Sequence, residues 1–148
     1  MTNDEIKKQF NDSEVMFLTI VGEARSEPIE GQVAVANVIL NRSRKRGQSV
    51  KDVCLSPKQF SCWNEDDPNR ALLIAIAHQM LKGSYEFPDY QQIQWVVDGI
   101  FSDKIRDNTR GRDHYMTTYL FNSDKRPSWA KTPKADPIRI GSHTFLSV

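Results

Sequence analysis

The sequence predicts a mainly helical (α+β) domain with a small β-hairpin near its C-terminus. Apolar residues recur at helical spacing in several segments of the first two thirds of the chain. The last third instead combines loops with short runs of aromatic residues, Thr and Ile, which favour strands. A length of 148 residues fits a single domain, predicted to cover 1–148, and is enough to bury a core.

The composition narrows the class of protein. Hydrophobic residues make up 39% and charged residues 26% of the chain, as in a soluble globular protein. The formal net charge is +1, whereas dedicated nucleic-acid binders are usually strongly basic. No apolar run reaches the roughly 18 residues needed to span a bilayer, and the charged N-terminus lacks an apolar signal core. We therefore expect a monomer that is made in the cytoplasm, with no nucleic-acid partner and no membrane insertion.

The first half of the chain contains the clearest helix signals. Asn11 and Glu14 form a capping pattern. Pro28 is suited to the first turn of a helix and unsuited to its interior. Gly47 follows a cationic last turn, as at many helix ends. The predicted elements are one helical turn containing Ile6 and Phe10, a helix from about 12 to 25, a second from about 28 to 45, and a short third from 49 to 55.

A loop is expected over 56–69, followed by helices over 69–82 and 89–101. The near-continuous apolar character of 69–82 predicts that this helix is central and buried, with Leu73 in the core alongside Ala36 of the earlier helix. His78 is expected to be packed or at the surface rather than a ligand. Trp95 is expected in the core.

The pattern changes after Phe101. Residues 103–113 are charged and without periodicity, which predicts a loop, and 122–137 contain three prolines, which predict another. Between them, 114–121 favour a strand. Residues 138–140 and 144–146 predict a hairpin joined at Gly141-Ser142. Cys54 and Cys62 are too few for a disulfide scaffold, and we expect reduced thiols.

Glu23 is the candidate catalytic residue. It lies at the predicted end of one apolar helix, directly before the start of another. A carboxylate at such a junction is partly shielded from water, which suits it to general acid work. The chain has three histidines, no His-Glu-x-x-His and no paired Cys motif, so neither a metal nor a cofactor is expected.

The stretch around Glu23 also resembles a known family. It reads Gly22-Glu23-Ala24-Arg25-Ser26-Glu27-Pro28-Ile29-Glu30-Gly31-Gln32-Val33-Ala34-Val35-Ala36, continues to Leu40-Asn41-Arg42, and is similar to the core motif of the SleB-like cell-wall hydrolases. That family includes spore-cortex-lytic enzymes and phage endolysins. Shorter matching blocks follow in the family's order: Gln59-Phe60-Ser61, Asp107-Asn108-Thr109-Arg110-Gly111, His114-Tyr115, Pro127-Ser128-Trp129-Ala130 and Ile140-Gly141-Ser142-His143-Thr144-Phe145. The resemblance covers roughly residues 13–146. One departure is Arg112-Asp113, where the family usually has Gly-Ala, and it bears on the shape of the substrate groove.

The resemblance implies a lysozyme-like fold and cleavage of peptidoglycan glycan strands between MurNAc and GlcNAc. Lytic transglycosylases need one carboxylate, and Glu23 is the candidate single acid/base. The absence of a signal core favours a phage endolysin released through a holin, with a bacterial enzyme exported by another route as the alternative. The resemblance also implies candidate substrate-binding residues: Gln59, Phe60, Ser61, Thr109, His114, Tyr115 and Trp129.

Three further possibilities stay open at this point. A hydrolytic muramidase would need a second carboxylate, for which Glu30 and Asp107 are candidates. Glu27 and Glu30 are, however, expected in the first turn of a helix, where negative charge stabilises the helix dipole. A non-catalytic glycan-binding phage structural protein would not need Glu23. The cationic run 42–46 could contact an anionic wall polymer or nucleic acid, but a solvated helix end is the favoured interpretation, because cations are common there.

Overall fold

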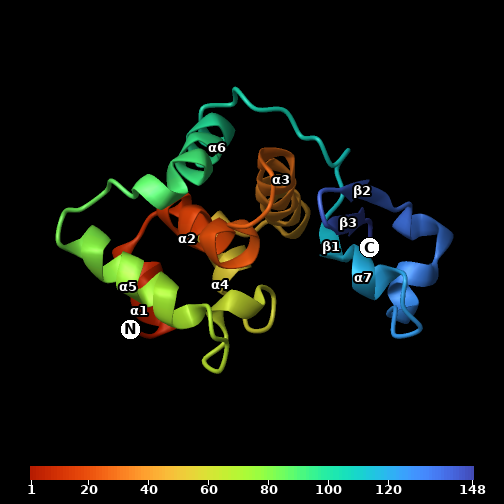
Figure 1. Ribbon diagram of the computed structural model, residues 1–148, viewed down its shortest axis with the longest axis horizontal. Coiled ribbons are helices and arrows are strands. Elements are labelled where there is room, and N and C mark those ends of the chain that lie inside the picture. Colours follow the sequence, from red (N-terminus) through yellow and green to blue (C-terminus); the bar gives the residue numbers. More distant parts are fainter.

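The computed structural model describes all residues from 1 to 148. A body of helices comes first in the chain, and a smaller lobe built on a three-stranded sheet follows it (Figure 1). The body contains α1 (Asn3–Gln9), α2 (Asp12–Ala24), α3 (Ile29–Arg46), α4 (Val50–Leu55), η1 (Ser61–Trp63), α5 (Arg70–Leu81), η2 (Pro88–Tyr90) and α6 (Gln91–Phe101). The lobe contains β1 (His114–Thr117), α7 (Thr118–Phe121), η3 (Ser128–Lys131), η4 (Pro133–Ala135), β2 (Ile138–Ile140) and β3 (His143–Leu146).

The central helix of the body is α2. Nine of its thirteen residues are buried, and it packs against α3, α4, α5 and α6 (Figure 1). Asn11 caps its N-terminus through a complete capping box with Glu14, as predicted. Because α2 is surrounded, its C-terminal residue Ala24 and the neighbouring Glu23 are held by packing on several sides.

The prediction that 69–82 forms the central helix is wrong. The helix exists as α5, but it packs mainly on α2 and lies at the edge of the body. Leu73 is fully buried, as is Ala36 on α3, so both core predictions are confirmed. Leu81 is 48% exposed, and His78 is at the surface.

Trp95 is a second correction. It lies on α6 with 60% of its surface exposed, whereas Ile93, Val96 and Val97 are buried. Position 95 is about 200° around the helix from position 93, since each residue turns the helix by about 100°. The apolar stripe of α6 therefore faces the body and leaves the indole outside it.

The junction between α2 and α3 is short. Pro28 is the N-cap of α3, and Gly47 closes that helix in the left-handed conformation at φ 62°.

At the end of α2, Gly22 lies against η1. A Cβ at Gly22 would come within 2.6 Å of the Cβ of Cys62, so only glycine permits this approach. The contact presses η1 against the end of α2.

The sheet has the order β1-β3-β2, with both pairs antiparallel. Tyr115 of β1 pairs with Phe145 of β3, and Ile140 of β2 pairs with His143 of β3. The predicted hairpin over 138–146 is confirmed. The strand predicted over 114–121 ends at Thr117, because the Thr117 side chain accepts from the amide of Leu120 and starts α7.

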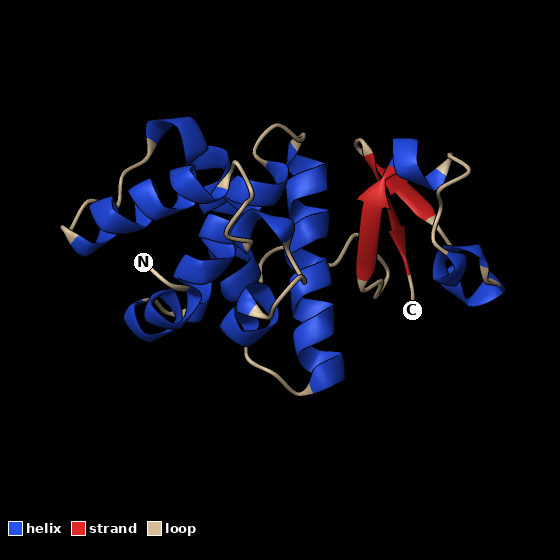
Figure 2. Cartoon of the chain, turned by 90° about the horizontal axis from the view of Figure 1, so that it is seen from below, coloured by secondary structure: helices blue, strands red, loops and turns tan.

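The sheet lies beside α3, the longest helix (Figure 2). This placement brings β1 next to the junction between α2 and α3, where Glu23 lies.

Cys54 and Cys62 are both buried free thiols, and burial raises the pKa of Cys54 to about 12. None of the helices combines the length and the apolar character that a membrane span requires.

Candidate active site

Glu23 lies on the last turn of α2 and is half-buried. Oε1 accepts a 2.6 Å hydrogen bond from the phenol of Tyr115. Oε2 accepts from the backbone N–H of Cys62 at 3.2 Å and from the hydroxyl of Ser61 at 3.4 Å. Three donors from two distant segments therefore fix the orientation of one carboxylate, and its partial exposure leaves it open to a ligand.

Tyr115 reaches Glu23 from β1. Burial raises the pKa of Tyr115 well above its usual value, and the nearby charge of Glu23 raises it further. The phenol therefore stays protonated and donates. Its ring packs tilted on Phe145 at 5.6 Å and edge-on to His143 at 5.1 Å between centroids, so the sheet fixes its position.

The two donors on η1, the Ser61 hydroxyl and the Cys62 amide, are held in place by the core that lies under this segment. The indole N–H of Trp63 donates to the hydroxyl of Thr19 at 2.9 Å, and both residues are buried in the body. Trp63 is therefore part of the core under this loop. Together with the contact between Gly22 and Cys62, this bond keeps the amide of Cys62 aimed at Glu23.

A second carboxylate at the junction, Glu27, belongs to a separate network. Its Oε1 accepts from the amide of Ser142 at 3.0 Å and from Nδ1 of His143 at 3.0 Å, and its Oε2 accepts from the hydroxyl of Ser142 at 2.7 Å. Partial burial alone would raise the pKa of Glu27, but the hydrogen bonds from Ser142 and His143 outweigh it and lower that pKa. The expectation that Glu27 lies in the first turn of α3 is wrong: it precedes the cap Pro28 and fastens the β2–β3 turn to the body.

The Asp-x-Thr segment forms a loop anchor. Asp107 accepts from the amide and hydroxyl of Thr109, from the amide of Gly111 and from Asn41 of α3. Burial alone would raise the pKa of Asp107, but these hydrogen bonds lower it. Thr109 is fully buried and also receives a bond from Asn41. The contacts of both residues therefore fasten the loop to α3, and none of them reaches Glu23.

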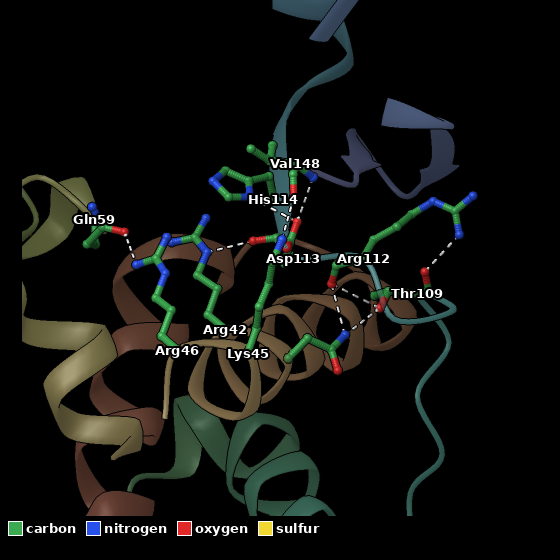
Figure 3. A network of polar contacts seen from close by, with 10 residues as sticks. Arg42, Lys45, Arg46, Gln59, Thr109, Arg112, Asp113, His114 and Val148 are labelled. Atoms are coloured by element: carbon green, nitrogen blue, oxygen red, sulfur yellow. Dashed lines mark hydrogen bonds and ion pairs between the residues drawn. The ribbon is translucent and has the colours of Figure 1, made fainter. Parts of the chain in front are cut away.

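Of the remaining predicted residues, Gln59 and His114 lie beside the C-terminal half of α3 (Figure 3). Gln59 accepts from Arg46 at 2.8 Å. Phe60 is 2% exposed, which makes it a core residue without an open face for a sugar. His114 pairs with Asp113 at 3.0 Å and packs edge-on to Trp129, which is 37% exposed.

Of the seven predicted substrate contacts, the structure brings Ser61 and Tyr115 to Glu23 itself. The sequence did not reveal the amide donor of Cys62 or the pairing of Glu27 with the β2–β3 turn. A backbone donor leaves no side-chain signal, and the Glu27 contact joins residues 115 positions apart. The matching block 140–145 was the one available hint. No group of three His, Cys, Asp or Glu side chains in the chain is arranged to hold a metal ion.

Comparisons with known proteins identify the family of this chain. Residues 26–146 match the family described as Cell Wall Hydrolase, a range that begins just after Glu23. The chain is 33% identical over 139 residues to the spore cortex-lytic enzyme of Halalkalibacterium halodurans and 47% identical over 138 residues to that of Bacillus subtilis. These matches cover 93% and 91% of this chain but 35% and 37% of those proteins, so the chain spans little more than a third of their length.

Solved structures share the fold. The catalytic domain of the germination-specific lytic transglycosylase SleB from Bacillus anthracis superposes with a TM-score of 0.57 at 24% identity, covering 94% of this chain and 98% of that one. The catalytic domain of the Bacillus cereus SleB protein gives the same TM-score and identity, over 92% of this chain and 89% of that one. The expected lysozyme-like fold, helical with a small sheet, is confirmed. The chain belongs to the cell wall hydrolase family.

Proposed function

We propose that this chain cleaves the glycan strands of peptidoglycan between MurNAc and GlcNAc, as a lytic transglycosylase with Glu23 as its single acid/base. The observation that carries the proposal is the set of three donors around one half-exposed carboxylate. Membership of the cell wall hydrolase family and the names of its relatives support the substrate class.

The reaction needs one carboxyl group in two protonation states. Protonated Glu23 gives its proton to the glycosidic oxygen as the bond to C1 of muramic acid breaks. The resulting carboxylate then takes the proton of the C6 hydroxyl while that oxygen closes on C1. The product is a 1,6-anhydro sugar, and no water is consumed. Tyr115 and the Cys62 amide stabilise the carboxylate between the two steps because both donate to its oxygens.

The product mass tests this mechanism. Purified peptidoglycan is digested and the fragments are weighed. Anhydro ends, one water lighter than reducing ends, are the expected result. Reducing ends alone would instead support the alternative of a hydrolytic muramidase. Intact strands that bind the protein without being cut would support a non-catalytic glycan-binding role.

We further propose that the protein is a phage endolysin, which reaches the host wall from the cytoplasm through a holin. The resemblance to a family with phage endolysins supports this role, while the relatives named spore cortex-lytic enzymes support a bacterial cortex-lytic enzyme as the alternative. Expression in a bacterial host should cause lysis when a holin is co-expressed. Cleavage of spore cortex but not of vegetative wall would favour the alternative.

A further inference from the structure

Two arginines on the C-terminal half of α3 project from the same face of the helix, and neither is paired with a carboxylate. Arg42 and Arg46 are four residues apart, so their side chains are neighbours on one face of the helix. Like charges at this spacing destabilise a helix. Neither guanidinium belongs to any of the ion pairs in the structure. Figure 3 shows both side chains rising from α3, Arg42 toward Asp113 and Arg46 toward Gln59.

Arg42 is almost completely buried, with 6% of its surface exposed. Its guanidinium lies 4.9 Å from the centre of the Phe60 ring, and Nε donates to the carbonyl of Asp113 at 2.6 Å. Its two terminal nitrogens have no hydrogen-bond partner in the protein, and they are not among the fully enclosed polar atoms that lack one. The outer edge of a buried cation therefore reaches the surface with its donors free.

The carboxylate of Asp113, whose backbone carbonyl accepts from Arg42, is already engaged. Oδ2 of Asp113 pairs with Nζ of Lys45 at 2.6 Å, and its Oδ1 contacts Nδ1 of His114 and the amide of Val148, each at 3.0 Å. Arg46 gives one N–H to Gln59. Of the three cationic side chains Arg42, Lys45 and Arg46, only Lys45 is therefore paired with the carboxylate of Asp113. The two arginines keep free donors on the same side of α3.

This surface adjoins the candidate active site. Arg46 contacts Gln59, Arg42 lies against Phe60, and Ser61 donates to Glu23, so three consecutive residues connect the arginines to the carboxylate. A polymer lying across Glu23 would pass within reach of both guanidinium groups.

We propose that Arg42 and Arg46 form a binding site for an oxyanion carried by the glycan strand. The planar forks of two guanidinium groups match the oxygens of a carboxylate or a phosphate. In a bacterial wall these groups come from the stem peptides on muramic acid and from phosphate polymers attached to the strand. The ligand assignment rests on the proposed function, whereas the anion site itself rests on the arginine geometry.

Binding without turnover tests the site. Insoluble wall glycan is sedimented with protein that carries Glu23→Gln, so that cleavage does not interfere. Arg46→Gln in this background is compared with Arg44→Gln, which removes the same charge from an exposed position of the same helix turn that makes no hydrogen bond or ion pair. The wall is used intact, freed of phosphate polymers with hydrofluoric acid, amidated at its carboxylates with carbodiimide, or treated in both ways.

We expect Arg46→Gln to weaken binding to the intact wall about 5- to 20-fold more than Arg44→Gln, the range for a charge-assisted contact near solvent. A difference that disappears after amidation assigns the site to stem-peptide carboxylates, and one that disappears after acid treatment assigns it to phosphate. Equal binding by the two variants, or a difference that survives both treatments, would overturn the site. A failure of the proposed function would give a different result: the wild-type protein would bind the wall but leave its strands uncut.

Discussion

The phenol of Tyr115 donates to the carboxylate of Glu23 across 92 positions of sequence, at 2.6 Å. The bond joins the small sheet to the end of the central helix, so the site exists only when both parts of the chain are folded together. Glu27 makes a second connection of the same kind through Ser142 and His143. The two carboxylates of one short junction therefore have different tasks: one is held half-exposed, and the other fastens the lobe.

The first prediction concerns Glu23 itself. Glu23→Gln should keep the fold and lower lysis of purified peptidoglycan by at least ~100-fold, the scale of lost general acid catalysis. The amide oxygen can still accept from Tyr115, but the amide nitrogen cannot accept from the N–H of Cys62, so the melting temperature should fall modestly while the protein stays folded. Near-normal lysis by a folded Glu23→Gln protein would remove Glu23 from the mechanism.

The second prediction concerns Tyr115 as a positioning residue. Tyr115→Phe removes the hydroxyl that orients Glu23 and keeps the ring packed on Phe145. A misplaced catalytic group should lower kcat by about 10- to 100-fold, with a smaller change in KM. Steady-state kinetics on soluble glycan strands measure both constants.

Tyr119→Phe is the matched control, since Tyr119 is 88% exposed and makes no side-chain hydrogen bond. It should behave as wild type. An unchanged kcat in Tyr115→Phe would mean that the amide of Cys62 and the hydroxyl of Ser61 suffice to hold Glu23.

The third prediction is a pH dependence of stability that involves Glu27. Its pKa is lowered below the ordinary value of 4.5 in the folded protein, so the folded state favours the ionised form. The stabilisation is complete above the unfolded pKa and is lost as pH falls through the folded pKa. Glu27→Gln should therefore cost about 1–3 kcal/mol at pH 7 and progressively less below about pH 4.5.

Thermal melts of both proteins between pH 7 and pH 3 make this comparison. Asp107 and Asp113 also have lowered pKa values, so wild type should lose stability in acid even without the Glu27 contribution. The difference between the two proteins isolates Glu27. A difference in melting temperature that stays constant with pH would show that the contacts of Glu27 do not depend on its charge.

The fourth prediction concerns the packing of α5 on α2. Leu73 is fully buried, and Leu73→Ala should destabilise the protein by roughly 2–5 kcal/mol through lost burial and the cavity left behind. Leu81→Ala on the same helix, at 48% exposure, should cost far less. Chemical denaturation gives both values. Equal effects from the two substitutions would contradict the observed orientation of α5.

Much of the fold could be predicted because its signals are local. The caps at Asn11, Pro28 and Gly47 bound two helices within a residue or two of their observed ends. Which helix lies at the centre of the core could not be predicted in the same way. Apolar content made α5 look central, but a central position depends on how many elements surround a helix, and α2 has neighbours on more sides.

The prediction for Trp95 failed for a different reason. It was expected in the core because tryptophan is a large apolar residue, although its position relative to the apolar stripe of α6 already placed it on the outer face of the helix. The site was predictable only in part, at Glu23 and its motif. The partners of Glu23 come from η1 and β1, and neither register nor spacing in the sequence specifies such long-range contacts.

The last prediction separates a single-carboxylate mechanism from a hydrolytic one. Glu23 accepts from three orienting donors and forms no ion pair, whereas the three contacts of Glu27 fasten it to Ser142 and His143. The side chain of Glu30 is exposed and makes no hydrogen bond, and Asp107 is occupied in a loop anchor. Glu30→Gln and Asp107→Asn should therefore change stability or substrate affinity more than kcat, and the products should keep anhydro ends.

A hydrolase would behave otherwise. An inverting enzyme needs a second carboxylate roughly 6.5–9.5 Å from the acid to hold a water, and a retaining enzyme needs one about 5–5.5 Å away as nucleophile. Glu27 is the other carboxylate at the junction, so Glu27→Gln belongs in the same series. Its contacts with Ser142 and His143 predict a loss of stability with kcat retained below the melting temperature. Measurement of kcat and product mass for all three variants decides between the mechanisms. A fall in kcat as deep as that of Glu23→Gln in any of them, with reducing ends as the sole products, would replace the transglycosylase with a hydrolytic muramidase.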